Sequence, residues 1–217
     1  ASKLTPPHTT GTRRAAIAAG EMTSISIGTR QRSVKRTFGS ALLAAAPSGV
    51  DTSWGRALTN DTDGPLDMVF QFEHVDRGGR GGKWASGALD LVWLKGVMSR
   101  WQNDLHGVGW NSLYLSNHDQ PRQVSRFGDD GQYRVESAKM LAIWLHLHQG
   151  TPYVCQGEEI GMTNVAFTSL DEYRDIESLN YASEAAGRGV PAGEVLRAIH
   201  AVGRDNLGAG DAVVGQR

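Results

Sequence analysis

Apolar positions follow a repeating pattern from Leu66 onward, in which a short apolar run is followed by polar residues and then by a longer periodic stretch. The run 66–72 is rich in β-branched and aromatic residues and predicts a strand. In 88–105 the apolar residues recur every three or four positions, which predicts a helix with one buried face. Its members are Leu91, Leu94, Val97, Met98, Trp101 and Leu105.

The same order recurs twice more. Residues 110–115 predict a strand, 116–131 a polar loop, and 135–148 a helix. The predicted buried set of that helix is Met140, Leu141, Trp144, Leu145 and Leu147. A third strand over 151–155 opens into the loop 156–168, and helices are predicted over 170–179 and 193–202. Polar motifs that follow each strand favour an α/β fold with parallel strands, as in a TIM (β/α)8 barrel, although a doubly wound sheet would place its loops similarly.

Residues 1–64 differ from the rest because they are rich in Thr, Ser, Ala, Gly and Arg. Their clear apolar runs are 15–19 and 41–46, so this segment is expected to pack poorly by itself, with 31–64 as a linker. With 40% hydrophobic residues among 217, the chain can bury a substantial core.

Charge and cysteine usage narrow the classes of partner. The formal net charge is −1, from 22 basic and 23 acidic residues, which does not favour nucleic acid or an anionic membrane. A small neutral polar ligand fits better, and protein partners stay unassigned. No apolar stretch approaches the roughly 18 residues of a membrane span, and no apolar run resembles a signal peptide. Cys155 has no cysteine partner in this chain, so a cytoplasmic location is expected and the residue is interpreted as strand packing.

The densest polar motif is Asn117, His118, Asp119, Gln120, Pro121 and Arg122, directly after the strand 110–115. So many hydrogen-bonding and charged groups are costly to bury unless a ligand or a network satisfies them. A capped turn, in which Asp119 and Pro121 serve loop geometry alone, is the alternative.

Two further acidic motifs are candidates for chemistry. Glu21 follows the small apolar run 15–19, and partial burial there would raise the pKa of its carboxyl and suit it to proton donation; a solvated surface group is the alternative. Glu158 and Glu159 follow the third strand and could line a pocket or pair with an arginine, although a solvated loop is favoured. No histidine spacing suits zinc and no glycine motif suits a phosphate, so no metal or cofactor is predicted.

Together these motifs resemble glycoside hydrolase family 13, the α-amylase superfamily, in its oligo-1,6-glucosidase and α-glucosidase branch. The resemblance covers about half of the chain, over 67–180, in the family's order and spacing. The segments that carry it are MVFQFEH, GGKW, GWNSLYLSNHDQPR, VSRFGDDGQYRVESAKMLA, QGTPYVCQGEEIGMTNV and EYRDIESLN.

The resemblance implies a TIM barrel and a retaining glycosidase acting on α-linked glucose oligosaccharides. It also implies three regions: a poorly matched N-terminal segment 1–64 that includes Glu21, barrel strands 6 to 8 with their helices over 65–206, and a divergent tail 207–217. It assigns Asp119 to transition-state stabilisation and Glu21 to acid/base catalysis. It also implies substrate contacts for residues of the NHD motif, of MVFQFEH and of the C-terminal GRDN segment: Asn117, His118, Arg122, Phe70, Gln71, Glu73 and Arg204.

The chain departs from the family at one decisive point. The family's nucleophile lies in a segment of the type DGFRxD before the acid/base glutamate, and no such segment precedes Glu21. The expectation is an incomplete barrel from a truncated or decayed gene, inactive by itself. The alternatives are a sugar-binding remnant without catalysis and a fragment of a sucrose isomerase or trehalose synthase relative.

Overall fold

A computed structural model describes residues 43–46, 49–76, 83–84, 89–165 and 167–204 of the chain. The chain divides into two compact units. Of the described residues, the first unit holds those up to Phe72 together with 99–112 and 149–151. The second unit holds those within 73–98 and 113–148 and those from Pro152 to Arg204.

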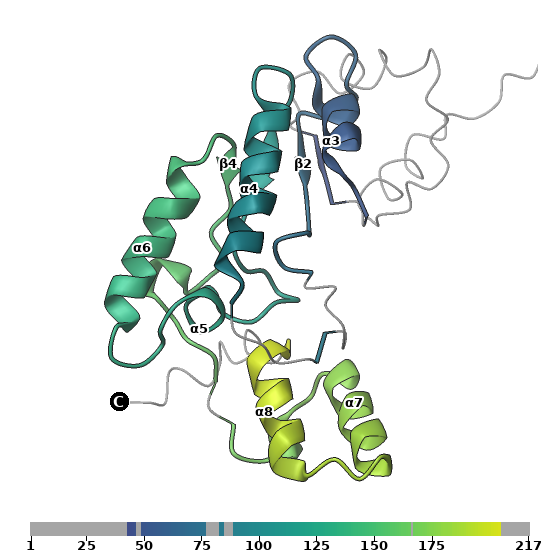
Figure 1. The fold of residues 1–217 in the computed structure, drawn as a ribbon, viewed down its shortest axis with the longest axis vertical. Coiled ribbons are helices and arrows are strands. Elements are labelled where there is room, and N and C mark those ends of the chain that lie inside the picture. The colour runs from purple at the N-terminus through teal and green to yellow at the C-terminus, as the bar shows by residue number, and fades with distance from the viewer. Residues whose placement is uncertain (1–42, 47–48, 77–82, 85–88, 166, 205–217) are drawn as a thin grey trace, which may run out of the picture. The chain divides into compact units, whose positions relative to one another are not determined.

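Among the described residues, four short strands form a sheet in chain order, β1-β2-β3-β4. Two of them, β2 and β4, are labelled in Figure 1. They are β1 (Ala44–Ala45), β2 (Met68–Phe70), β3 (Asn111–Leu113) and β4 (Thr151–Pro152). β2 pairs in parallel with both β1 and β3. Beside β4, the N–H of Tyr153 donates to the carbonyl of Leu113 at 2.7 Å. The predicted parallel order is therefore confirmed, with strands shorter than the apolar runs that predicted them.

The segment 31–64, expected to be a linker, instead contains β1 and helix α3 (Thr52–Thr59). Asp51 begins α3, because its carboxylate accepts the N–H of Trp54 at 3.0 Å and so satisfies an otherwise unpaired helix terminus. Gly55 allows close packing, since a Cβ there would lie 2.8 Å from the Trp101 ring. The linker prediction is wrong here because composition does not register a capping residue or a tertiary contact.

Helix α4 (Leu91–Leu105) confirms the predicted periodicity. Leu94, Val97, Met98, Trp101 and Leu105 are all buried, whereas Leu91 is 55% exposed at the first turn. Two glycines follow the end of α4. Gly107 has a φ of 70°, and Gly109 packs against Thr59.

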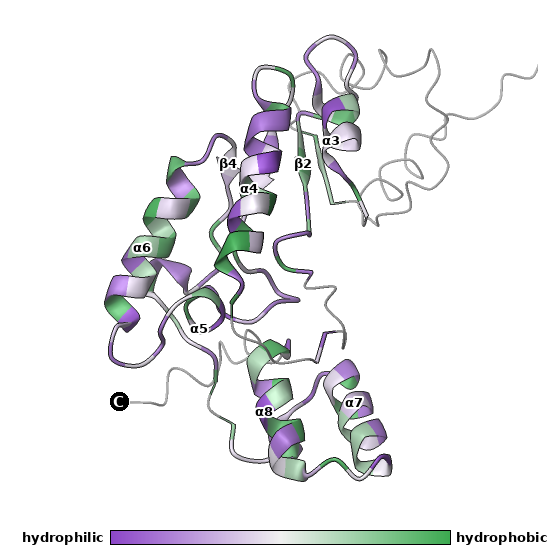
Figure 2. Ribbon diagram, in the orientation of Figure 1, coloured by the Kyte–Doolittle hydropathy of each residue, from purple (hydrophilic) through white to green (hydrophobic). Residues whose placement is uncertain are grey.

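The predicted loop 116–131 contains a short helix, α5 (Gln123–Phe127), which is followed by α6 (Arg134–Leu147). The predicted buried set of α6 is only partly correct. Leu141 and Leu145 are buried, but Met140 is 49% and Leu147 81% exposed. Apolar residues occur along much of α6 rather than in one stripe (Figure 2), so periodicity could not tell which face packs inward.

The C-terminal part of the second unit is a helical layer. The predicted helix 170–179 is instead a short 3-10 turn, η2 (Leu170–Glu172), and then α7 (Ile176–Gly187). The carboxylate of Asp175 caps α7 by accepting the N–H of Ser178 at 2.9 Å. Helix α8 (Ala192–Val202) follows and matches its prediction closely. The cluster that joins α7 and α8 is centred on Tyr173, Ala185, Val195 and Ile199.

Candidate functional site

The NHD motif forms a tight turn directly beyond the buried end of β3. Leu115 and Ser116 are buried, and the chain then turns so that the side-chain oxygen of Asn117 accepts the N–H of Asp119 at 2.8 Å. The N–H of Gln120 donates to the carbonyl of Asn117 at 3.0 Å. Asn117 therefore supports the loop that carries Asp119.

Two basic side chains flank the carboxylate of Asp119. One oxygen lies 3.4 Å from Nε2 of His118 and the other lies 3.4 Å from Nε of Arg204. The side chain of Asp119 is 41% exposed, so its acceptor sites remain accessible to a ligand. His118 is 89% exposed. The structure thus brings together three residues that the resemblance assigned to the site, although Arg204 lies far away in the sequence.

A second carboxylate, Glu177 at the start of α7, extends this charged cluster. Its Oε2 lies 3.7 Å from Nε of Arg204 and 2.5 Å from Nζ of Lys83. Alternating acidic and basic groups therefore run from Lys83 to Asp119. Lys83 lies in GGKW and Glu177 in EYRDIESLN, two of the segments that carry the family resemblance. The local sequence pattern does not distinguish either residue from a solvated charge.

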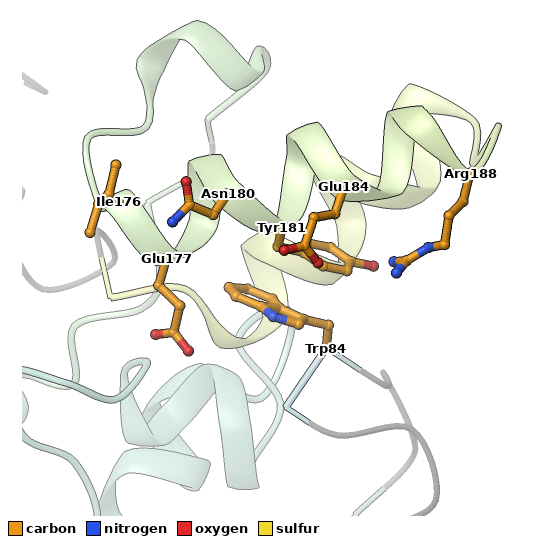
Figure 3. A pocket seen from close by; sticks show the side chains of 7 residues that line it. All are labelled: Trp84, Ile176, Glu177, Asn180, Tyr181, Glu184 and Arg188. Carbon is orange, nitrogen blue, oxygen red and sulfur yellow. The ribbon is translucent and has the colours of Figure 1, made fainter.

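A cavity of about 630 Å³ opens beside Glu177 (Figure 3). The indole of Trp84 stacks on the ring of Tyr181, with centroids 4.5 Å apart and planes 8° from parallel. Aromatic, acidic, amide and basic side chains line the cavity: Trp84, Ile176, Glu177, Asn180, Tyr181, Glu184 and Arg188. Such a mixture of flat apolar surface and hydrogen-bonding groups suits a polar organic ligand.

Arg122 occupies a different environment from the other candidates. It is 3% exposed, and its guanidinium donates to the carbonyl of Gln156. Its backbone N–H donates to the side-chain oxygen of Asn164 at 2.9 Å. These contacts brace the loop after β3 against the loop after β4, while the substrate contact that the sequence predicts for Arg122 stays a prediction.

Glu158 and Glu159 have opposite environments. Glu158, at the start of the 3-10 turn η1 (Glu158–Ile160), is 7% exposed, so the solvated loop favoured for it is wrong. Its two oxygens accept the hydroxyl of Ser116 and, at 3.1 Å, the N–H of Cys155. Burial raises the pKa of the Glu158 carboxyl, and these two hydrogen bonds and the charge of Arg122 oppose the rise. Glu159 is exposed.

Phe70 and Gln71 belong to the first unit, where Phe70 ends β2 and is half-buried and Gln71 is buried. Glu73 is half-buried in the second unit. His74, also in the second unit, is buried, and its Nε2 donates to the carbonyl of Tyr114 at 2.7 Å. Burial lowers the pKa of His74 to about 4, so its ring is neutral at physiological pH.

Glu21, the predicted acid/base residue, lies outside the described residues. Within the described ranges, no cluster of three or more His, Cys, Asp or Glu residues could hold a metal ion. The helices in the same part of the chain are too short or too polar to cross a membrane.

The chain matches the family model "Alpha amylase, catalytic domain" over residues 33–206. The match begins inside the segment 1–64 that composition set apart. The chain is 58% identical over 160 residues to the oligo-1,6-glucosidase of Parageobacillus thermoglucosidasius. This alignment covers 73% of this chain and 28% of that protein. It is 50% identical over 151 residues to the trehalose-6-phosphate hydrolase of Bacillus subtilis (strain 168), covering 68% and 27% of the two chains.

Solved structures agree with the sequence comparison. The trehalose-6-phosphate hydrolase of Bacillus licheniformis superimposes with a TM-score of 0.77 at 41% identity, over 82% of this chain and 34% of that one. The isomaltulose synthase of Klebsiella sp. LX3 gives a TM-score of 0.72 at 30% identity, over 82% and 34%.

The chain therefore spans about a third or less of the relatives that it matches. Together with the parallel sheet and its helices, these matches confirm the expected α/β fold, part of a TIM (β/α)8 barrel. The chain belongs to the α-amylase family, glycoside hydrolase family 13.

Proposed function

We propose that the chain forms part of a glycosidase that hydrolyses α-glucosidic bonds in short oligosaccharides with retention of anomeric configuration. The observation that carries this proposal is the half-exposed carboxylate of Asp119, presented beyond the end of β3 and flanked by His118 and Arg204. In TIM-barrel enzymes, reacting groups occupy loops at this end of the strands. One of the similar proteins is named oligo-1,6-glucosidase, and another is named trehalose-6-phosphate hydrolase.

In a retaining reaction, a carboxylate attacks the anomeric carbon while a carboxylic acid protonates the leaving oxygen, and the resulting glycosyl ester is then hydrolysed by water. We assign proton transfer to Glu21. Asp119 accepts hydrogen bonds from sugar hydroxyls, and these bonds strengthen as positive charge develops on the ring. Three neighbouring residues position Asp119 or contact the same sugar: His118, Arg204 and Asn117. The remaining proposed substrate contacts are Arg122, Phe70, Gln71 and Glu73.

A transglycosylating enzyme is the second candidate, because the isomaltulose synthase of Klebsiella sp. LX3 shares the fold at 30% identity. The two functions use the same covalent chemistry and differ in whether water or a sugar hydroxyl receives the glucosyl group. Product analysis separates them: hydrolysis of sucrose or isomaltose releases monosaccharides, whereas transfer yields a new disaccharide.

A chimera tests the hydrolase proposal in a whole barrel. The matching segment of the P. thermoglucosidasius oligo-1,6-glucosidase is replaced by the 160 residues that are 58% identical in this chain. We expect the chimera to hydrolyse isomaltose and to release glucose first as the α-anomer, detected by proton NMR. Replacing Asp119→Asn should reduce kcat by about 10²–10³-fold, because a contact specific to the transition state is lost.

Asp130→Asn is the matched control, since Asp130 is exposed in the next loop and the substitution makes the same change of charge. It should leave kcat unchanged. A folded chimera that retains full activity after Asp119→Asn would refute the assignment of Asp119. A folded chimera that releases β-glucose first would refute retention.

A further inference from the structure

The carboxylate of Glu158 links the loops after β3 and β4. Glu158 is 7% exposed and Ser116 is 2% exposed. The Ser116 hydroxyl donates to one oxygen of Glu158, and the N–H of Cys155 donates to the other at 3.1 Å. Because the N–H of Glu158 donates in turn to the carbonyl of Cys155 at 2.9 Å, the acidic side chain is tied to its own loop and reaches across to the next.

Ser116 is the last buried residue before the turn that presents Asp119. The turn itself is held locally, by the hydrogen bond from the N–H of Asp119 to the side chain of Asn117. Glu158 therefore holds the residue from which this turn begins, so loss of its contact with Ser116 would loosen the turn and displace Asp119. Small displacements of a group that acts on the transition state have large kinetic effects.

Opposing effects act on the pKa of the Glu158 carboxyl. Removing a carboxylate from water is costly, and burial does raise the pKa of this group. Two hydrogen-bond donors and the guanidinium of Arg122 lower this pKa and so oppose the effect of burial. The guanidinium itself donates to the carbonyl of Gln156. Gly157 makes room for this arrangement, since its φ is 95° and a Cβ there would lie 2.8 Å from the guanidinium.

We propose that Glu158 is a positioning residue for Asp119, acting through Ser116 to set where the Asn117–His118–Asp119 turn stands relative to the end of β3. Its importance for catalysis rests on the function proposed for Asp119. Its effect on the position of the turn does not.

Backbone amide hydrogen exchange of the 217-residue chain, followed by NMR, tests the positional effect without any sugar. Ser116→Ala removes the hydroxyl. Glu158→Gln replaces one of the two acceptor oxygens by an NH2 group, so the Ser116 hydroxyl and the Cys155 N–H can no longer each donate to an oxygen of their own. We expect both variants to exchange the Asp119 amide about tenfold faster or more, while Leu141 and Leu145 of α6 change by less than about twofold. Ser116→Thr, which keeps the hydroxyl, should restore slow exchange at Asp119.

Glu159→Gln is the matched control, because it makes the same change in the adjacent, exposed residue. It should leave the Asp119 amide unchanged. Unaltered exchange at Asp119 in both test variants would overturn the proposal. Equal acceleration at Asp119 and in α6 would also overturn it, since Glu158 would then only stabilise the fold.

The chimera described above supplies the catalytic arm. Glu158→Gln should lower kcat about tenfold with KM changed less than about twofold, whereas Glu159→Gln changes neither. If exchange at Asp119 responds as expected but the chimera is inactive before any substitution, the proposed function fails and the positioning role stands. An active chimera whose kcat is unaffected by Glu158→Gln would contradict the catalytic consequence.

Discussion

At the residue scale, His74 shows how burial alone changes the chemistry of a side chain. Its ring is buried, it donates to the carbonyl of Tyr114, and its pKa falls from 6.5 to about 4, with the charge of Arg126 contributing. A histidine that must stay neutral in the folded state couples stability to pH. His74 lies in the segment MVFQFEH, and the sequence could not indicate that its ring is buried.

The direction of the pH effect follows from the two pKa values. In the unfolded chain His74 gains a proton as pH falls through 6.5, whereas in the folded chain it does so only near pH 4. Its stabilising effect is therefore complete above pH 6.5 and is lost as pH falls toward 4. We expect this residue to account for a loss of about 3 kcal/mol in the free energy of unfolding across that interval.

Urea denaturation at pH 7 and pH 4 measures this loss. In His74→Gln, which retains an N–H donor and does not titrate, the difference between the two pH values should shrink by about that amount, roughly 3 kcal/mol. His146→Gln, in an exposed position on α6, should preserve the difference seen in the unsubstituted chain. An unchanged difference in His74→Gln would show that His74 does not carry the effect.

The sequence predicted some members of the charged cluster around Asp119 and missed others. Asp119 and His118 stood out because polar residues were concentrated after an apolar strand, and the family motif identified Arg204. Glu177 and Lys83 were missed, because an acidic residue at the start of a helix and a lysine beside a glycine-rich segment are ordinary surface features. Only the folded chain shows that their charged groups meet, with Nζ and Oε2 separated by 2.5 Å.

At the scale of elements, two helical glycines provide a matched pair for testing the packing. Gly55 lies in α3 with room for no side chain, since a Cβ would be 2.8 Å from Trp101 and 3.4 Å from Leu105. Gly96 lies in α4, and a Cβ there would meet nothing within 4 Å. Gly55 and Gly96 are not among the described glycines with a positive φ. The difference between them is therefore the space available for a side chain.

We expect Gly96→Ala to raise the free energy of unfolding by about 0.5–1 kcal/mol, because alanine loses less backbone entropy in a helix. Gly55→Ala should lower it by about 1–3 kcal/mol, because the new methyl group must displace the Trp101 ring. Chemical denaturation of both variants checks the two signs. A stabilised Gly55→Ala variant would mean that α3 does not pack on α4 as the structure shows.

Periodicity predicted the existence of most helices but not their limits or their buried faces. Helix α8 matched its pattern because its apolar residues form one clear stripe, whereas α6 has apolar residues along much of its surface. Helix α3 was missed because its segment looked like a linker by composition. A single capping carboxylate at Asp51 and a glycine that fits under Trp101 decide its formation.

At the scale of the whole molecule, the proposed activity requires groups beyond Asp119. The 217 residues contain no segment of the type DGFRxD, which in the resembling family carries the nucleophile. Without a covalent route, the remaining carboxylates provide only weak acid assistance. We therefore expect the purified 217-residue chain to show no measurable turnover of 4-nitrophenyl α-glucoside.

Release of 4-nitrophenol, followed by absorbance against a blank without protein, checks this expectation. The P. thermoglucosidasius enzyme provides the positive control for the assay. Turnover by the purified chain that disappears in Glu21→Gln would contradict the expectation, because catalysis would then proceed without the nucleophile segment.

The sequence by itself determined the strands and the longer helices over 66–155, the last helix over 193–202, the family, and the presence of polar motifs after the strands. These properties depend on local periodicity and on residues that are close together in the chain. The tertiary structure alone decided that Glu158 is buried while Glu159 is exposed, and that Arg204 and Glu177 meet beside Asp119. Burial and ionic contacts between distant residues arise only when separate elements pack, so no local pattern encodes them.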